Sequence, residues 1–375
     1  MKQNSSWMRK GAEPEFEYWF TALLGISARK KCEIRSQGYE PADLYRMKPE
    51  EVYAFCVYFD IKPEILLEAQ KITDLTAPVI RMEQQDISFV TIQDACYPGK
   101  LKKISDPPYC LFYRGNLPKD QVSAAIVGAR KCSEYGRMTA EKIACALAEN
   151  EIPVISGLAM GIDSAGHKGA LCGGGLTFGV LGCGPDICYP ASSRYLYDRI
   201  LKNHGSILSE YVPGTKPLPQ FFPSRNRIIS GLSDLVIVVE AKRRSGSLIT
   251  ADFALEQGKE IYAVPGRCCD ALSWGTNHLI YQGAGILYDL EKFLEDCNLK
   301  QTKHHPKQTC EQLGLEKEEQ LLYSCLDLEP KYLDIIIEET GYSVVQVLDH
   351  LNTLRKKGLV SECYKNYFRK NTYES

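Results

Sequence analysis

The chain has 375 residues, of which 44% are hydrophobic and 25% are charged. This composition excludes a largely disordered chain, and the length predicts two or three domains. The 45 Lys and Arg residues nearly balance the 47 Asp and Glu residues, and the formal net charge is −2. A polyanionic partner would therefore have to bind a local basic surface, because the chain as a whole is not basic.

The 15 cysteines indicate neither a disulfide framework nor a zinc site. The sequence has no C-x-x-C pair and no run of Cys and His at zinc-ligand spacing. It also has no readable signal peptide and no run of about 18 apolar residues. Free cysteines without an export signal are typical of a reducing compartment. We therefore predict a cytoplasmic protein with no membrane association, no bound metal and no other cofactor.

Residues 1–80 predict a small helical domain of the SAM or helix-hairpin-helix type. Apolar and aromatic residues cluster in FEYWFTALLGI, and three later segments begin beside a proline, which favours the first turn of a helix. Gly25-Ile26-Ser27 precedes a basic segment and resembles a helix-hairpin-helix turn, which can hold a DNA phosphate on backbone amides. A helical bundle without a ligand explains the same pattern, so both interpretations stay open.

Residues 85–295 predict a parallel α/β domain. Apolar, β-rich segments recur about every 25–30 residues, with helical patterns in most of the gaps. These segments are 123–128, 152–156, 176–182, 206–210, 235–240 and 260–264. Nearly continuous apolar character indicates strands that crossover helices bury on both faces. The predicted fold class is therefore α/β, an extended Rossmann-like, doubly wound parallel sheet with its ligand crevice at the carboxyl ends of the strands.

Residues 297–316 are polar and lack apolar periodicity, which is typical of a linker. Three short helical patterns and a β-hairpin pattern follow in residues 317–375, an order typical of a winged-helix domain. From residue 316 to the end, 8 Lys and Arg stand against 11 Asp and Glu, a balance of 8 − 11 = −3. Proteins that read the major groove usually concentrate positive charge. A protein-binding or regulatory role therefore fits this domain better than sequence-specific repression.

Glycine-rich or basic turns follow the predicted strands. Glycine lets backbone amides approach an anion closely, and the helix N-termini that follow add a favourable dipole. Because these turns meet at one edge of a parallel sheet, they predict a phosphate-binding rim, although packing alone also requires glycine at such turns. The rim candidates are Gly128, Arg130, Lys131, Gly157, Lys242, Arg244, Ser245, Gly246 and Ser247.

Seven segments between about Tyr97 and Leu287 form an ordered set of motifs. They include AIVGARKCSEYGR, ISGLAMGIDSAGHKGAL, GVLGCGPDICYP, LSEYVPGTKPLPQFFPSRNRIISGLS and VVEAKRRSGSLITADFALEQGKEIYAVPG. This set resembles the DNA-processing protein A (DprA, also called Smf) family of bacterial recombination mediators. The resemblance implies a protein that binds single-stranded DNA without catalysis, protects incoming DNA and helps load the RecA recombinase during natural transformation. The expected partners are single-stranded DNA, RecA and a second copy of the chain in a homodimer.

Basic groups on three separate turns are the expected DNA contacts. Arg130 follows the first predicted strand, and Lys242–Arg244 precede a Ser-Gly-Ser turn. Arg225 and Arg227 flank Asn226, which is also a candidate DNA contact. A guanidinium group can hold a phosphate through paired hydrogen bonds. We expect Arg130 to bind phosphate. We also expect at least one of the two closely spaced arginines to touch DNA, since the other can serve a structural ion pair.

Two further residue pairs have two interpretations each. Asp163 and His167 are four residues apart in a predicted helix, and a local hydrogen bond that fixes the loop is favoured over a catalytic acid–base pair. Phe221 and Phe222 could stack on bases, as single-strand binders often require, or pack in the core.

The chain departs from the family pattern at one turn. A basic residue commonly follows the Tyr-Pro pair in relatives, whereas Ala191 stands here. Arg194, one helical turn later, is the expected replacement and is included among the candidate DNA contacts.

The main alternative function is hydrolysis of a nucleotide or nucleoside phosphate. The sequence contains no G-x-x-x-x-G-K-[ST], no G-x-G-x-x-G after the first strand and no G-x-S-x-G. Lysine-decarboxylase-like phosphoribohydrolases carry a P-G-G-x-G-T-x-x-E loop whose glutamate assists cleavage. The comparable loop here, residues 244–251, has no carboxylate at that spacing, so we predict a binding protein with no catalytic residues.

Overall fold

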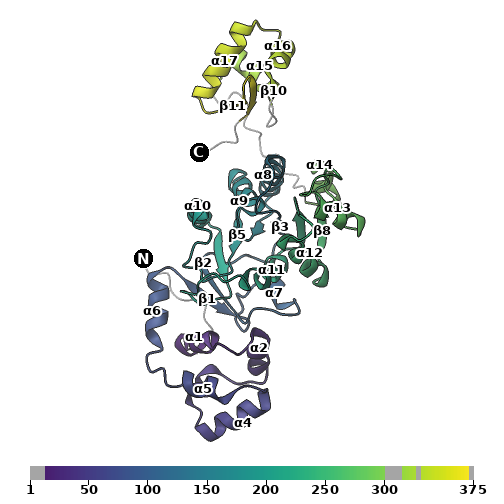
Figure 1. The fold of residues 1–375 in the computed structure, drawn as a ribbon. Helices are drawn as coiled ribbons and strands as arrows, with labels where there is room; N and C mark the ends of the chain where they lie inside the picture. The colour runs from purple at the N-terminus through teal and green to yellow at the C-terminus, as the bar shows by residue number, and fades with distance from the viewer. Residues whose placement is uncertain (1–12, 300–314, 327–330, 371–375) are drawn as a thin grey trace. The chain divides into compact units, whose positions relative to one another are not determined.

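The computed structural model describes residues 13–299, 315–326 and 331–370 (Figure 1). The chain forms two compact units, Met1–Lys300 and Gln301–Ser375. Most of the predicted linker, residues 297–316, lies outside the described residues. Across these described ranges, no helix is both long enough and apolar enough to cross a membrane.

Six short helices form the first part of the larger unit. They are α1 (Pro14–Ala22), α2 (Ala28–Ser36), α3 (Pro41–Arg46), α4 (Pro49–Phe59), α5 (Pro63–Ala69) and α6 (Thr76–Gln84). Proline opens α1, α3, α4 and α5, where its missing N–H removes no helical hydrogen bond. Phe20, Leu44 and Phe59 of these helices share one core with Phe89 and Phe112 of the sheet. The domain boundary predicted between residues 80 and 85 therefore falls inside one compact unit, at a point where the secondary structure changes.

A nine-stranded sheet with the order β1-β2-β6-β5-β4-β3-β7-β8-β9 forms the centre of the unit. Its strands are β1 (Ser88–Thr91), β2 (Cys110–Gly115), β3 (Ala124–Val127), β4 (Val154–Ser156), β5 (Thr177–Val180), β6 (Ser206–Ser209), β7 (Leu235–Val238), β8 (Glu260–Ala263) and β9 (Gly285–Ile286). All pairings from β6 to β9 are parallel, whereas β2 runs antiparallel to both of its neighbours. The α/β class and the six predicted strands are confirmed, and β1, β2 and β9 are additional.

Helices cover both faces of this sheet. They are α7 (Gly99–Lys102), α8 (Glu134–Glu149), α9 (Ile162–Cys172), α10 (Arg194–Lys202), α11 (Phe221–Leu232), α12 (Gly246–Glu256), α13 (Trp274–Tyr281) and α14 (Leu290–Asp296), with the 3-10 turn η1 (Ala191–Ser193) before α10. Alternate residues of β3 point to opposite faces. Ala125 and Val127 pack with α7, α11, α12 and α13, whereas Ala124 and Ile126 pack with α8, α9 and α14. Figure 1 shows α8 and α9 on one side of β3 and β5, and α7 and α11 on the other.

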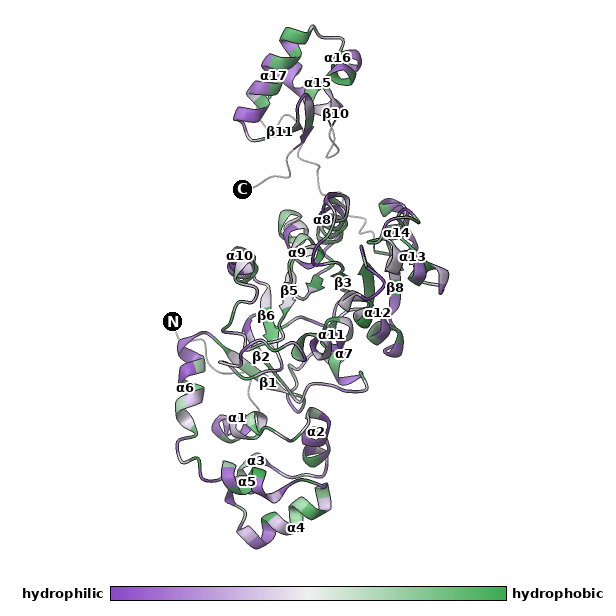
Figure 2. Cartoon of the chain, viewed as in Figure 1, coloured by the Kyte–Doolittle hydropathy of each residue, from purple (hydrophilic) through white to green (hydrophobic). Residues whose placement is uncertain are grey.

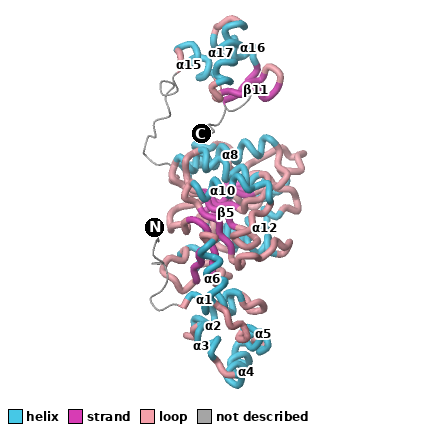
Figure 3. The backbone as a smooth tube through the Cα atoms, turned by 90° about the vertical axis from the view of Figure 1, so that its left-hand side faces the viewer, coloured by secondary structure: helices cyan, strands magenta, loops and turns pink. Residues whose placement is uncertain are grey.

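The colouring of the ribbon agrees with this layered packing. Helices such as α8 and α12 carry both hydrophilic and hydrophobic residues (Figure 2), as expected where one side faces a core and the other faces solvent. The strands lie inside the unit, with helices around them (Figure 3).

The strand order reverses direction between β3 and β7. From β3 the chain adds β4, β5 and β6 on one side, and it then returns to place β7, β8 and β9 on the other. In open α/β sheets ligands bind at such a switch point, outside the carboxyl ends of the strands. A ligand-binding site is therefore expected at the turns after β3 and β7.

The smaller unit contains α15 (Lys317–Cys325), β10 (Lys331–Tyr332), α16 (Leu333–Thr340), α17 (Val344–Lys356), β11 (Val360–Tyr364) and β12 (Tyr367–Lys370). Its three strands form an antiparallel sheet in the order β10-β12-β11. Leu322, Ile336, Leu351 and Phe368 belong to its core. The unit thus has its own hydrophobic core, made by three helices and a small sheet.

Candidate nucleic-acid interface

Glycine packs the turn after β3 against the turn after β4. A Cβ on Gly128 would lie 2.6 Å from Cγ1 of Ile162. Gly161 has a φ of +79°, and a Cβ there would lie 2.3 Å from the carbonyl oxygen of Ala129. Only glycine combines that backbone conformation with such a close approach. These two glycines are therefore required for packing, which is the alternative that the sequence left open.

Buried carboxylates already use backbone amides at both of these turns. The N–H of Ser133, which caps α8, donates to Oε2 of Glu240 at 2.9 Å, and Glu240 is 5% exposed. The N–H of Gly157 donates to Oδ2 of Asp163 at 3.1 Å, and Asp163 is also buried. An amide that holds an internal carboxylate is not free for a phosphate. The prediction that these turns bind phosphate through their amides is therefore corrected for Gly157 and for the start of α8.

Arg130 instead presents its side chain to solvent beside aromatic rings. Its guanidinium carbon lies 5.5 Å from the ring centroid of Phe222, and both Arg130 and Lys131 are exposed. The Phe222 ring lies 5.5 Å from that of Tyr189, which is 45% exposed. Phe221 stacks on Tyr211 with centroids 4.2 Å apart. A cation and two accessible rings thus meet outside the ends of β3 and β5, and we call Arg130, Tyr189 and Phe222 the aromatic rim.

Arg225 is buried beneath this surface. It is 4% exposed and its Nη1 donates to the carbonyl oxygens of Gly157, at 2.8 Å, and of Val180. Burial lowers the pKa of Arg225 to about 10, while the carboxylate of Asp163 acts in the opposite direction. The guanidinium occupies the space left by Gly157, where a Cβ would lie 2.5 Å from Nη2 of Arg225. Arg225 therefore joins the ends of β4 and β5 from within.

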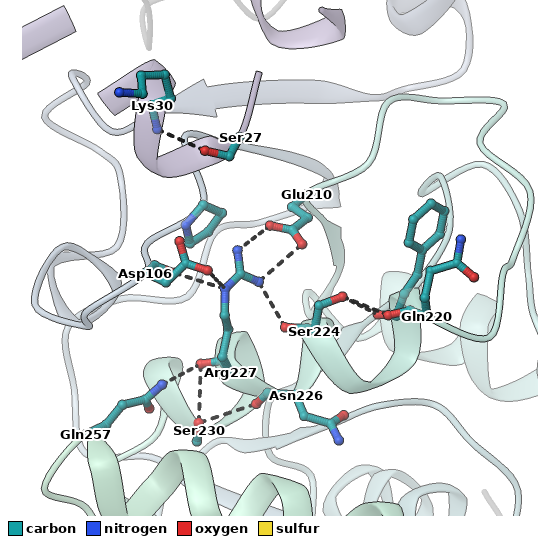
Figure 4. A network of polar contacts seen from close by, with 12 residues as sticks. Ser27, Lys30, Asp106, Glu210, Gln220, Ser224, Asn226, Arg227, Ser230 and Gln257 are labelled. Atoms are coloured by element: carbon teal, nitrogen blue, oxygen red, sulfur yellow. Dashed lines mark hydrogen bonds and ion pairs between the residues drawn. The ribbon is translucent and has the colours of Figure 1, made fainter. Parts of the chain in front are cut away.

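Arg227 is also internal, and Figure 4 shows its partners. Its Nε donates to the carbonyl oxygen and the carboxylate of Asp106, at 2.9 and 3.0 Å, and its Nη2 to Glu210 at 2.6 Å. Arg227 is 6% exposed. We predicted that at least one of Arg225 and Arg227 touches DNA, whereas both guanidinium groups bind protein oxygens. The correction is that this pair positions α11 and its aromatic residues.

Asn226, between the two arginines, is buried and donates from Nδ2 to the carbonyl oxygen of Gly246 at 3.1 Å. It thereby fixes the turn that follows β7. In that turn Ser245 caps α12 by accepting from the N–H of Ser247, at 3.4 Å. Ser247 is buried, whereas Lys242, Arg243, Arg244 and Gly246 are exposed. The turn thus offers three cations. Asn226 and Ser247 were predicted to contact DNA, and the correction is that both are buried and hold the turn in place.

Asp163 and His167 have different partners and do not form an acid–base pair at the surface. Burial raises the pKa of Asp163, and Arg225 lowers it by a smaller amount. His167 is 0% exposed, and its Nδ1 lies 2.7 Å from Oγ1 of Thr177. That hydroxyl donates to the carbonyl oxygen of Val154, so Nδ1 of His167 is the donor in their contact. Burial lowers the pKa of His167 to about 3, and the ring is neutral.

Arg194 is exposed at the start of α10. Its guanidinium lies 5.2 Å from the ring of Tyr197, and Nη1 is 3.9 Å from Oδ1 of Asp198. Such an exposed ion pair is weak, so the charge of Arg194 stays available to a phosphate. Among the residues that the structure describes, no group of three or more His, Cys, Asp or Glu side chains could hold a metal ion.

Sequence reasoning missed two aromatic residues that the structure places beside the cations. Tyr189 belongs to the motif GVLGCGPDICYP but has no local feature that points to the β3 turn. Trp274 begins α13, and the guanidinium of Arg243 lies 5.3 Å from its ring. Both contacts join segments far apart in the chain, so no spacing rule could reveal them.

Comparisons with known sequences show which family this chain resembles. Residues 88–298 match the model of the family "DNA recombination-mediator protein A". The chain is 48% identical to DNA processing protein DprA of Streptococcus pneumoniae over 210 residues, covering 55% of this chain and 72% of the relative. It is 35% identical to protein Smf of Escherichia coli over 297 residues, covering 77% of this chain and 79% of the relative.

Two solved structures are also similar. The crystal structure of DprA from Streptococcus pneumoniae matches with a TM-score of 0.65 and 38% identity, over 75% of this chain and 97% of that one. A structure of DNA processing protein A from Helicobacter pylori, described in terms of its single-stranded DNA binding mode, matches with a TM-score of 0.51 and 29% identity. It covers 56% of this chain and 95% of its own. The family match spans more than half of the chain, so this protein belongs to the DNA recombination-mediator protein A (DprA/Smf) family.

Proposed function

We propose that this protein is a single-stranded DNA-binding recombination mediator that acts in the cytoplasm. In this role it protects incoming DNA and helps load the RecA recombinase during natural transformation. Membership in the DprA/Smf family supports the general role. The observation that carries the DNA-binding part is the aromatic rim, in which Arg130 lies over Phe222 beside Tyr189.

The chemistry of the aromatic rim favours a single strand over a duplex. A guanidinium binds backbone phosphate, and exposed rings stack on bases without regard to their identity. Stacking requires bases that are not already paired within a duplex, so Tyr189 and Phe222 gain little from double-stranded DNA. Because Glu240 and Asp163 use the inner amides, the strand is expected to run over the exposed side chains.

We propose no catalytic activity. Asp163 and His167, the one acid–base pair that the sequence singled out, are buried and contact different partners. A general base must lie within hydrogen-bond reach of its substrate. Incubation with nucleoside monophosphates, ATP or NAD should release no base, phosphate or reduced cofactor above background. Turnover that follows the purified protein and disappears in Asp163→Asn would favour the hydrolase alternative.

The other partners are proposals of the same kind. A homodimer is supported by large apolar side chains that are exposed around β9, at one edge of the sheet: Tyr281 is 87%, Ile286 47% and Tyr288 71% exposed. We propose that the smaller unit is a winged-helix domain that binds protein. Val345 and Leu348, exposed on α17, support a protein partner better than a phosphate backbone. The proposal that this protein helps load RecA rests on its family membership.

Fluorescence anisotropy with labelled oligothymidylate and with a duplex, each over a series of salt concentrations, tests the proposal. We expect single strands to bind more tightly, with a log–log salt slope of about −0.7 for each phosphate neutralised. Arg130→Ala should lower the affinity by about ten- to a hundredfold, because it removes a charge-assisted contact. The melting temperature should be unchanged, since the side chain is exposed.

Arg46→Ala is the matched control. Arg46 is also exposed and lies 4.8 Å over an aromatic ring, that of Phe16, but it belongs to α3 among the N-terminal helices. Its substitution should leave DNA binding unchanged. Equal or tighter binding of the duplex would contradict the proposed preference for single strands. An Arg130→Ala protein with normal affinity and salt slope would contradict the position of the site.

A further inference from the structure

A basic hollow lies beside the turn that follows β7. It has a volume of about 660 Å³ and is lined by Lys242, Arg243, Arg244, Ala271 and Trp274. No acidic side chain lines it. Within the described part of the chain, none of these three cations has an ion-pair partner. The hollow therefore combines concentrated, unneutralised positive charge with one large aromatic ring.

The fold holds the ring and the cations together. The N–H of Gly275 donates to the carbonyl oxygen of Ala241 at 2.7 Å, and the N–H of Ala241 donates to that of Leu272 at 2.7 Å. A Cβ on Gly275 would lie 2.7 Å from Cβ of Ala241, so glycine is what allows the start of α13 to lie against the turn after β7. Trp274 is the neighbour of Gly275 and is thereby fixed beside Lys242–Arg244. Backbone hydrogen bonds between the β7 turn and the start of α13 therefore fix the position of the hollow.

Arg243 covers the face of the Trp274 indole and can be displaced from it. Arg243 lies 5.3 Å from the ring of Trp274, which is 38% exposed, and its guanidinium is itself exposed. An exposed cation–π contact is weaker than the stacking of a base on an aromatic ring. A base can therefore replace Arg243 on Trp274, and the released guanidinium can bind a phosphate. His278 stacks on the same indole at 4.8 Å and steadies the ring.

The hollow and the aromatic rim follow neighbouring strands at the switch point. The turn with Arg130 follows β3 and the turn with Lys242 follows β7, and these two strands are hydrogen-bonded neighbours that end in register at Val127 and Val238. Neighbouring strands lie about 4.8 Å apart. A single strand of DNA that continues from the β3 turn can therefore reach the β7 turn.

We propose that the hollow is a second nucleotide subsite, in which a base of single-stranded DNA stacks on Trp274 and its flanking phosphates contact Lys242, Arg243 and Arg244. The assignment rests on the proposed function and extends it, because it gives the direction in which the strand continues beyond Arg130. The ligand is defined by its chemistry as an unpaired base joined to a chain of phosphates.

Tryptophan fluorescence of the full-length protein tests this assignment. The chain has three tryptophans, so the signal of Trp274 is taken as the difference between the wild-type protein and Trp274→Ala. Oligothymidylates of increasing length are titrated, and binding is followed in parallel by anisotropy. We expect short oligomers to bind without quenching this signal and longer ones to quench it. Trp274→Ala should weaken the binding of long oligomers about five- to a hundredfold and spare short ones.

Two variants separate stacking from charge. Trp274→Phe keeps a ring and should retain most of the affinity, whereas Arg243→Gln should reduce the salt slope for long oligomers by about 0.7. Melting temperatures equal to that of the wild-type protein identify variants that fold normally. Arg244→Gln is the matched partner of Arg243→Gln, because it removes the same charge without uncovering the indole. Arg244→Gln should lower the salt slope for long oligomers as much as Arg243→Gln does. It should leave the Trp274 fluorescence of the DNA-free protein unchanged.

The outcomes distinguish this inference from the proposed function. Arg130-dependent DNA binding that neither quenches Trp274 nor responds to Trp274→Ala overturns the subsite alone. Failure to bind any single strand overturns both. Equal quenching by thymidine monophosphate means a site for free nucleotides and overturns the strand assignment. A Trp274 signal that changes with protein concentration in the absence of DNA means that a second copy covers the ring, which also overturns it.

Discussion

Arg225 provides the sharpest test of whether a basic residue of this family motif contacts DNA or supports the surface that does. Replacing it with alanine removes hydrogen bonds to the carbonyl oxygens of Gly157 and Val180, at the ends of β4 and β5. A hydrogen bond to a charged group contributes about 1.5–3 kcal/mol, and two of them give a destabilisation of about 3–6 kcal/mol. At about 2–4 °C for each kcal/mol, the melting temperature should fall by at least about 6 °C.

The assay compares thermal melts, followed by circular dichroism, with DNA affinity measured well below the transition. Arg244→Ala is the control, because that exposed arginine of the β7 turn should change stability by less than about 0.5 kcal/mol. If Arg225→Ala melts within about 2 °C of the wild-type protein yet loses DNA binding, Arg225 contacts DNA directly and the positioning role assigned here is wrong.

The Arg225→Ala effect should also depend on pH through Asp163. The folded protein raises the pKa of Asp163 above 3.8, so this group contributes stability below that pH and loses it as the pH rises through the folded pKa. The charge of Arg225 lowers the folded pKa of Asp163, so this pKa is higher in Arg225→Ala. The stability of the variant therefore continues to fall up to a higher pH than that of the wild-type protein. The gap in stability between variant and wild type should therefore be larger at about pH 8 than at about pH 4. A constant gap would mean that the two groups are not coupled.

Two further substitutions test the buried side of the site. Burial lowers the pKa of His167 from 6.5 to about 3, so the unfolded chain binds a proton that the folded chain does not, and stability falls as the pH drops from 6.5 towards 3. At pH 5 this amounts to about 2 kcal/mol, and urea midpoints of His167→Gln should show a shallower pH dependence; an equal slope would refute the shift. Gly169→Ala places a Cβ 2.2 Å from the carbonyl oxygen of Glu141 and should cost about 1–3 kcal/mol by separating α9 from α8. The control Gly246→Ala meets nothing within 4 Å and should melt normally, so equal stability of the two variants would contradict the packing argument.

The sequence predicted the sheet well because its strands are buried on both faces. Six nearly continuous apolar segments mark β3 to β8, and each is found in the structure. The strands β1 and β2 were missed because they form an antiparallel pair outside the repeating strand–helix pattern. The strand β9 has only two residues, which is too short for any periodicity.

The site was harder to predict because residue type does not reveal burial. Arg225 and Arg227 have the chemistry of phosphate ligands, but Arg227 is neutralised by Asp106, 121 residues away, and by Glu210, 17 residues away. Arg130 differs only in that its turn leaves it exposed. One signal was present in the motifs themselves, because Glu240 ends its strand segment and Asp163 lies in the first turn of a helix. Their carboxylates accept from the N–H groups of Ser133 and Gly157, which lie in turns that we predicted to bind phosphate.

The shared core of the N-terminal helices and the sheet has a practical consequence for dividing this protein into parts. A fragment that begins at residue 85 would retain Phe89 and Phe112 but lose the aromatic residues that cover them, among them Phe20 and Tyr18. It would also loosen β2, which pairs with β6. The next residue after β6 is Glu210, the ion-pair partner of Arg227 in α11. Through β2, β6 and Glu210 the N-terminal helices thus support α11, and the shortest fragment that keeps this support starts at α1.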